Sequence, residues 1–505
     1  MDVLLWLLLA VPLIGGAAVS SRAVVPDAAV TRFGVTASGV TLGLAVLAAG
    51  AFDYRRADRM QLVGDAAWIP AIDVRFHLGV DGVSLPMVLL TALLTFLCLL
   101  FTTRYRPEGG RPRALIALIL LLETGMLGTF VALDLIVFFL FFEVVLIPMW
   151  FVIALWGDPH DESGRRRAAT TFLLYTVLGS ALMLVGFLVV YAGAGTFDLE
   201  LLAERRGAGI AAGAQIAAAV LIGLGLAVKT PMWPLHSWLP DAHAKAPTIG
   251  SVLLAGVLLK MGTYGFIRVW LPVVPDGVRV VAPYFAGLAA VGIVYGALAC
   301  LAQRELKRLI AYSSVGHMGF VLLGITTLTA VGVNGAVFAG VAHGLITGLL
   351  FFVVGAIKDR HGTGELAELG GGLYARMPRL GALLAFGAVA SLGLPGLAGF
   401  WGEMLALLGA YEPAAGLSRP TFLVLMVIGG LGAVLTAGYF LLLLKRVCQG
   451  EPAGPAAAVG GHRDVTVLEA WCWAPLVLAT VVLGLYPKAL LALTDPAVQW
   501  LLGRG

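Results

Sequence analysis

The chain has 505 residues, of which 60% are hydrophobic and only 12% are charged, and its formal net charge is +4. A soluble domain carries roughly twice that charged fraction, so a globular core does not account for the composition. The small net charge forms no basic patch, which argues against a nucleic-acid-binding protein. The four cysteines are scattered singly, so neither a disulfide framework nor a cysteine metal site is expected.

Long apolar runs recur along the whole chain. Each run is about 18 residues or longer, which is enough for a helix to cross a bilayer. The first run, Val3–Ser20, lacks the preceding basic residue and the cleavage site of a signal peptide, so it is interpreted as a membrane helix. We predict an all-α polytopic protein with about fourteen membrane helices, at approximately 3–20, 34–52, 84–103, 114–132, 134–156, 168–192, 210–238, 247–270, 280–302, 309–329, 332–357, 379–409, 420–446 and 467–495.

Basic residues in the loops predict the orientation. Clusters of Lys and Arg follow the odd-numbered segments, at 104–113, 165–167, 304–308 and 358–379. Because cytoplasmic loops are enriched in Lys and Arg, these loops are placed in the cytoplasm of a cell inner (plasma) membrane, with both termini outside. The outer loop 53–83 is an exception with four Arg. The Gly/Pro/Ala-rich stretch Gln449–Asp464 is expected to be a flexible cytoplasmic loop.

Two segments are interrupted by proline. Segment 7 contains Pro231 and Pro234, and segment 12 contains Pro395 between glycines. Proline breaks a helix, and paired broken helices in corresponding positions indicate an inverted-repeat transporter. We therefore expect two inverted five-helix repeats with broken helices 7 and 12. The expected domains are 1–113 (three membrane helices), 114–278 (first repeat), 279–447 (second repeat) and 448–505 (loop and last membrane helix).

Ionisable residues deep inside these apolar runs carry the strongest chemical signal. Each charge costs a few kcal/mol or more at the bilayer centre, so such residues pair, line water or move protons. Histidine titrates near neutral pH, and desolvation brings the pKa values of lysine and glutamate toward neutrality, which suits all three residue types to a proton relay. The candidates are Glu123, Glu143, Lys229, Lys260, His317, His343 and Glu403.

Each assignment has a plainer alternative. Glu143 and Lys229 could form a static ion pair that holds two helices together, although such a pair leaves the other buried ionisable groups unexplained. Each histidine could equally be a satisfied core residue. Glu123 could be a protonated packing residue or could face a neighbouring subunit.

Several strings resemble one family of membrane subunits. PLHSWLPDAHAKAPTIGSVLLAGVLLKMGTYG (Pro234–Gly265) is similar to the signature of the M-type antiporter-like subunit of respiratory complex I, NADH–quinone oxidoreductase. LKRLIAYSSVGHMGF (Leu306–Phe320), FFEVVLIPMWFVIALWG (Phe141–Gly157) and GVDGVSLP (Gly79–Pro86) resemble the same family. The L-type sister subunit typically has a different string after WLPDA and a lysine where Glu403 stands.

The resemblance implies a proton half-channel in each repeat. It assigns Glu143 and Lys229 to a coupling pair, Lys260 to the centre, His317 and His343 to the connecting path, and Glu403 to the exit; Glu123 has no firm match. It also implies that this chain holds no cofactor, and that FMN, Fe–S clusters, NADH and quinone belong to other subunits. The implied partners are the neighbouring L-type and N-type subunits and the lipid bilayer.

Three other functions remain open from the sequence. The nearest is a subunit of a multisubunit Na⁺/H⁺ antiporter or of a membrane-bound hydrogenase-type complex, which shares the fold and much of the relay. A structural scaffold is disfavoured by the row of intramembrane ionisable residues. A standalone transporter is disfavoured because no substrate-selective polar pocket is evident.

Overall fold

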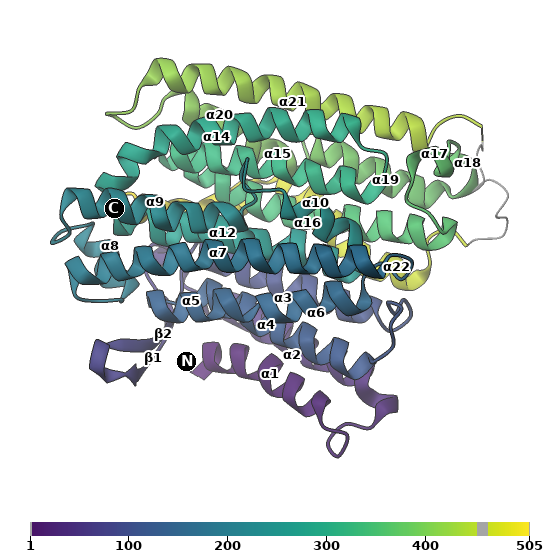
Figure 1. Cartoon of the computed structure of the whole chain (residues 1–505), viewed down its shortest axis with the longest axis horizontal. Coiled ribbons are helices and arrows are strands. Elements are labelled where there is room, and N and C mark those ends of the chain that lie inside the picture. The colour runs from purple at the N-terminus through teal and green to yellow at the C-terminus, as the bar shows by residue number, and fades with distance from the viewer. Residues whose placement is uncertain (1–2, 452–462, 504–505) are drawn as a thin grey trace.

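The computed structural model describes residues 3–451 and 463–503, and long helices that run in a common direction dominate it (Figure 1). In the described residues, 13 helices are long and apolar enough to cross a membrane. A further crossing is made by two shorter helices, α19 and α20, in series. The prediction of an all-α polytopic protein with about fourteen membrane helices is confirmed.

The N-terminal part contains three membrane helices and one element that the sequence analysis did not predict. Loop 53–83 holds a two-stranded antiparallel hairpin, and His77 of its second strand ties it to the loop before α8, with Nδ1 3.0 Å from Asp198 Oδ2. The elements are α1 (Val3–Ser20), η1 (Asp27–Ala29), α2 (Val30–Ala51), η2 (Tyr54–Arg56), β1 (Gln61–Ile69), η3 (Pro70–Ile72), β2 (Val74–Val80) and α3 (Ser84–Phe101).

The first five-helix set follows, and two of its membrane helices depart from regular geometry where none was expected. Segment 5 is divided at Val145, and segment 8 contains the π-helical turns η4 and η5. The elements are α4 (Pro112–Val131), α5 (Leu135–Val144), α6 (Leu146–Trp156), α7 (Glu162–Ala194), α8 (Leu199–Arg205), α9 (Ala212–Lys229), α10 (Trp238–Lys245), α11 (Thr248–Leu253), η4 (Leu254–Leu258), α12 (Leu259–Gly265), η5 (Phe266–Trp270) and α13 (Leu271–Val273).

The second set and the C-terminal part complete the bundle. Segment 14 was predicted to continue to residue 495, which is wrong: α22 ends at Leu485, before Pro487, and α23 is a separate helix. Most of the expected loop Gln449–Asp464 lies outside the described residues. The elements are α14 (Pro275–Ala302), α15 (Leu306–Thr326), α16 (Ala330–His361), α17 (Leu366–Leu369), α18 (Leu373–Arg376), α19 (Pro378–Ser391), α20 (Ala398–Tyr411), α21 (Arg419–Val447), α22 (Val467–Leu485) and α23 (Lys488–Leu501).

Both predicted breaks are present, and they occupy matching places. Segment 7 stops at Lys229 and resumes as α10 at Trp238, and segment 12 stops at Ser391 and resumes at Ala398. Each is the fourth helix of its set, and each packs against the long helix that precedes it, α7 in the first set and α16 in the second. Five crossings per set is an odd number, so the second set enters the membrane from the opposite side. This is the arrangement of inverted repeats.

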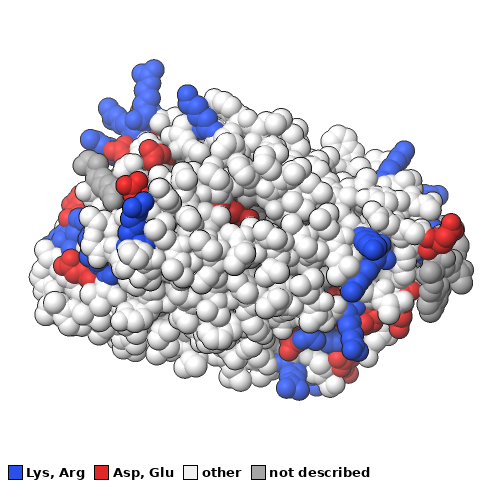
Figure 2. All heavy atoms as spheres, turned by 90° about the horizontal axis from the view of Figure 1, so that it is seen from above, with Lys and Arg blue, Asp and Glu red and all other residues white. Residues whose placement is uncertain are grey.

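The burial of the helices shows where the centre of the bundle lies. The apolar window of segment 8 is completely buried and that of α16 is 94% buried, whereas those of α1, α2, α21 and α22 are mostly exposed. On the face that Figure 2 shows, the surface between the two ends of the molecule is nearly free of charged side chains. Lipid therefore meets an apolar belt, and the ionisable residues of segment 8 and α16 are shielded from it.

The break in segment 12 depends on a close approach between its two halves. A β-carbon at Gly399, in the first turn of α20, would collide with the carbonyl oxygen of Ala390 in α19. Two further glycines of the break, Gly393 and Gly396, have φ values of 79° and 96°, which glycine adopts without strain. The sequence PG…GFWGE therefore shapes the bend that positions Glu403.

We expect Gly399→Ala to destabilise the protein by about 1–3 kcal/mol, because the added methyl group forces α19 and α20 apart. Thermal unfolding of the purified protein measures this. Gly430→Ala in α21 is the matched control, since a β-carbon there meets nothing within 4 Å. Equal melting temperatures for the two variants would contradict the close approach.

Candidate functional site

The seven predicted site residues lie on seven different helical elements, and six of them converge on the interior of the bundle. Lys229 ends α9 at the first break, and Glu403 follows the second break, as predicted. The others are Glu123 on α4, Glu143 on α5, Lys260 on α12, His317 on α15 and His343 on α16.

Glu143 and Lys229 are electrostatic neighbours without a direct ion pair. The Lys229 side chain is 1% exposed, and its Nζ has no hydrogen-bond partner among the described residues. It lies 5.0 Å from the centroid of the Phe142 ring, and the charge of Glu143 acts on it across the intervening space. Glu143 is partly exposed and lies beside Ser180 of α7. The two charges are therefore coupled but not locked together.

Lys260 and His343 form a direct hydrogen bond at the centre of the bundle. Lys260 Nζ lies 2.6 Å from His343 Nδ1 and 2.5 Å from the carbonyl oxygen of Ala255, in the π-helical turn η4. An ammonium group has only donors, so it donates to both atoms, and Nδ1 of a neutral imidazole accepts. The proton of this bond lies between two groups that can each hold it. The contact joins segment 8 of the first set to α16 of the second.

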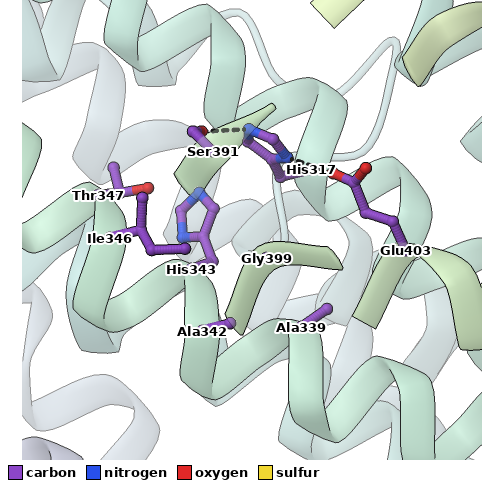
Figure 3. Close-up of a pocket in the computed structure, with 9 residues that line it drawn as sticks. All are labelled: His317, Ala339, Ala342, His343, Ile346, Thr347, Ser391, Gly399 and Glu403. Atoms are coloured by element: carbon purple, nitrogen blue, oxygen red, sulfur yellow. Dashed lines mark hydrogen bonds and ion pairs between the residues drawn. The ribbon is translucent and has the colours of Figure 1, made fainter. Parts of the chain in front are cut away.

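His317 lies between an acid and a hydroxyl group (Figure 3). Its Nδ1 is 2.9 Å from Glu403 Oε1, and its Nε2 is 2.9 Å from Ser391 Oγ. When His317 is neutral, Nδ1 donates to the carboxylate and Nε2 accepts from the hydroxyl. When it is charged, both nitrogens donate, and the hydroxyl can rotate to accept. His317 can therefore gain a proton without losing a hydrogen bond.

A small cavity joins the two histidines. The ring centroids of His317 and His343 are 5.6 Å apart, and both rings line a cavity of about 20 Å³ together with Ser391 and Glu403 (Figure 3). That volume is sufficient for one water molecule. From Lys260 Nζ to Glu403 Oε1, the groups thus form one row across the boundary between the two helix sets.

Glu123 stands apart from this row. It is completely buried in α4, and neither carboxylate oxygen has a hydrogen-bond partner among the described residues. No ion pair involves it in the described part of the chain. Its predicted role stays a prediction.

The sequence analysis did not select His243, which the structure places near the row. It is completely buried in α10, it stacks on Phe351 with ring centroids 4.5 Å apart, and neither ring nitrogen has a partner in the described residues. The charges of Lys307 and Lys260 both act on it. The stretch WLPDAHAK is polar and short, so nothing in its composition indicates burial.

A second omission is the buried ion pair between Arg268 of η5 and Asp81, just before α3. The side chains are 2% and 1% exposed, and Arg268 also donates to the Tyr264 hydroxyl at 3.2 Å. The sequence does indicate this pair, because Arg268 lies inside a predicted membrane segment, where a charged side chain requires a buried residue of opposite charge. The pair fixes the C-terminal part of segment 8 against the start of α3.

A large cavity opens at the end of the bundle where the basic loops lie. Its volume is about 430 Å³, and ionisable residues from both helix sets line it, among them Asp158, Lys307 and Lys358. Lys307 is almost completely buried and donates to the carbonyl oxygen of Ala246 at 2.5 Å, three residues from His243. Ala246 itself lines the cavity, so the cavity reaches the end of the short helix that carries His243.

Comparison with known proteins identifies the family. The family model for the membrane part of the NADH:quinone oxidoreductase/Mrp antiporter proteins matches residues 132–436. The chain is 42% identical over 477 residues to NADH-quinone oxidoreductase subunit M of Rhodobacter capsulatus, covering 92% of this chain and 89% of that protein. The chain belongs to the subunit M family of NADH-quinone oxidoreductase. The predicted resemblance to the M-type subunit is confirmed.

Solved structures agree with membership of the subunit M family. One chain of respiratory complex I from Thermus thermophilus superimposes with a TM-score of 0.85 at 32% identity, with both chains covered completely. A chain of the Mrp complex from Dietzia superimposes with a TM-score of 0.83 at 24% identity, covering 99% of this chain and 97% of that one. The second likeness concerns the fold alone.

We expect Glu403→Gln to lower the ratio of protons translocated to NADH oxidised while the complex still assembles. The amide oxygen can still accept from His317, but the side chain can no longer take up a proton. Proton uptake into inverted membrane vesicles, with NADH oxidation followed in parallel, measures the ratio. Glu412→Gln, at an exposed position just past the end of α20, is the control. An unchanged ratio in Glu403→Gln would remove Glu403 from the path.

Proposed function

We propose that this chain translocates protons across the membrane as the M-type subunit of a NADH–quinone oxidoreductase, through a relay of Glu143, Lys229, Lys260, His343, His317 and Glu403. Electron transfer takes place in other subunits, which hold FMN, Fe–S clusters, NADH and quinone. The released energy reaches this chain as a conformational or electrostatic signal.

The observation that carries the proposal is the row from Lys260 to Glu403. It contains the short contact between Lys260 and His343, the adjacent histidine rings, and the hydrogen bond from His317 to Glu403. Each member can hold or release a proton, and each is shielded from lipid. A scaffold needs no such row, because apolar packing holds helices together at lower cost than buried ionisable groups.

Glu143 and Lys229 supply the input to this row. A carboxylate near Lys229 stabilises its ammonium form, and movement of the carboxylate away favours release of the proton. The absence of a direct bond between them in the described residues leaves this switch free to operate. The static ion pair considered from the sequence is thereby disfavoured, since a locking pair requires direct contact.

We expect Glu143→Ala to abolish proton pumping coupled to this chain while assembly remains mostly intact, because the variant removes the charge that controls Lys229. Glu143→Asp keeps a carboxylate and is expected to be milder. Pumping is measured in inverted vesicles, and a native gel checks assembly. Glu162→Ala, which removes an exposed carboxylate from the start of α7, serves as the control. Normal pumping by an assembled Glu143→Ala complex would refute the switch.

The proposed partners are the L-type and N-type antiporter-like subunits of the same membrane arm, and the proposed location is the cell inner (plasma) membrane with both termini on the outer side. Proteins that copurify with the full-length chain test the assembly. Recovery of NADH-binding and Fe–S subunits is the expected result. Recovery of an antiporter or hydrogenase-type assembly without them would instead support the second candidate function.

A further inference from the structure

We propose that the groove between α1 and α2 binds an anionic phospholipid, with an acyl chain in the groove and the phosphate at Arg22 and Arg32. This inference is independent of the proton relay. It concerns α1 and α2, which pack against each other at one edge of the bundle (Figure 1).

The groove has the shape and chemistry of an acyl-chain site. Its volume is about 280 Å³, and almost all of its lining is apolar. The residues of α1 that line it follow the spacing of one helix face. The full lining is Val11, Ile14, Gly15, Ala18, Phe33, Thr36 and Ala37.

Gly15 has no side chain, and this lets α1 and α2 approach each other closely beneath the groove. A β-carbon there would lie 3.1 Å from the β-carbon of Ala37. On the open side, the side chain of Ile14 is 65% exposed. The hydroxyl of Thr36 donates a hydrogen bond to the carbonyl oxygen of Arg32 within its own helix, so it does not require a polar partner in the groove. An apolar ligand is therefore the matching one.

Two arginines lie at the polar end of this groove. Arg32 is one helical turn before Thr36 and so shares its face of α2, and helical side chains lean toward the N-terminus of their helix, which here is the end nearest water. Arg22 follows the end of α1 by two residues. Both are exposed, and within the described residues neither guanidinium group has a hydrogen bond or a salt bridge.

The charge balance at this end leaves Arg22 and Arg32 available. Asp27 is bound by Arg113, with Nη2 2.7 Å from Oδ1, and its charge acts on Arg22 only through space. Arg113 also donates to the carbonyl oxygens of Val19, Ser21 and Val25, which fixes the turn between α1 and α2. A surplus of positive charge therefore remains directly above an apolar groove open to the bilayer. An anionic phospholipid complements both features, and basic pockets between membrane helices are known to bind such headgroups.

The test uses the intact complex that contains the full-length chain, with a photo-reactive amino acid in place of Ile14. The complex is delipidated and then titrated with phosphatidylglycerol or with phosphatidylcholine, and crosslinked lipid is measured by mass spectrometry. We expect phosphatidylglycerol to crosslink at lower concentration than phosphatidylcholine. In the double variant Arg22→Ala/Arg32→Ala, the apparent affinity for phosphatidylglycerol should fall by about 25-fold, at about fivefold for each arginine.

Two controls separate this site from general attraction to a charged bilayer. Arg104→Ala removes an exposed arginine from the same end of the molecule but not from the groove, and should leave crosslinking unchanged. Ala18→Phe fills the groove and should reduce crosslinking of both lipids, whereas Ala17→Phe points away from it and should not. Equal affinity for the two lipids, no effect of the double variant, or crosslinking of Ile14 to another protein subunit would each overturn the proposal.

Discussion

The high free energy of an ionisable group in hydrocarbon governs the arrangement of this molecule. Lys229, Lys260, His343 and Glu123 are almost completely buried, and each sits behind helices that shield it from lipid. Segment 8 and α16 could not carry such residues at the lipid surface, so they occupy the centre, and α1, α2, α21 and α22, whose apolar windows are less than half buried, form the outside. The position of each helix thus follows from whether it carries an ionisable residue.

The same constraint explains where helices are irregular. A break in a membrane helix frees backbone groups that lipid cannot satisfy, so breaks occur only where protein or water surrounds them. Lys229 lies at one break, Glu403 follows the other, and the carbonyl oxygen of Ala255 in a π-helical turn accepts from Lys260. Irregular backbone and ionisable side chains therefore occur together in the shielded interior, and at Lys260 the irregular backbone itself supplies the hydrogen-bond acceptor.

Hydropathy and proline positions were sufficient to predict most of the membrane segments and both broken helices, and to select six residues of the candidate site, whose roles stay predictions. These predictions depend only on local sequence, since an apolar run with an ionisable residue or a proline inside it is visible within about twenty residues. The pairing of Lys260 with His343 could not be predicted, since 83 positions separate them and only the packing of segment 8 on α16 brings them together. His243 was missed because its neighbours are polar, and the hairpin 61–80 was missed because its residues resemble an ordinary acidic loop. Arg268 was overlooked although its apolar surroundings pointed to a buried partner such as Asp81.

The two halves of the proposed relay differ in a way that bears on coupling. In the second half, Lys260 is hydrogen-bonded to His343 and His317 is hydrogen-bonded to Glu403, and the two histidine rings, 5.6 Å apart, line one small cavity between these pairs. In the first half, Lys229 is buried without a hydrogen bond and is separated from Glu143. A hydrogen-bonded pair can pass a proton in either direction, whereas an unbonded lysine responds strongly to any charge that moves nearby, because the low-dielectric interior screens little. We therefore propose that control of the relay lies at Glu143 and Lys229, and that proton conduction takes place between Lys260 and Glu403.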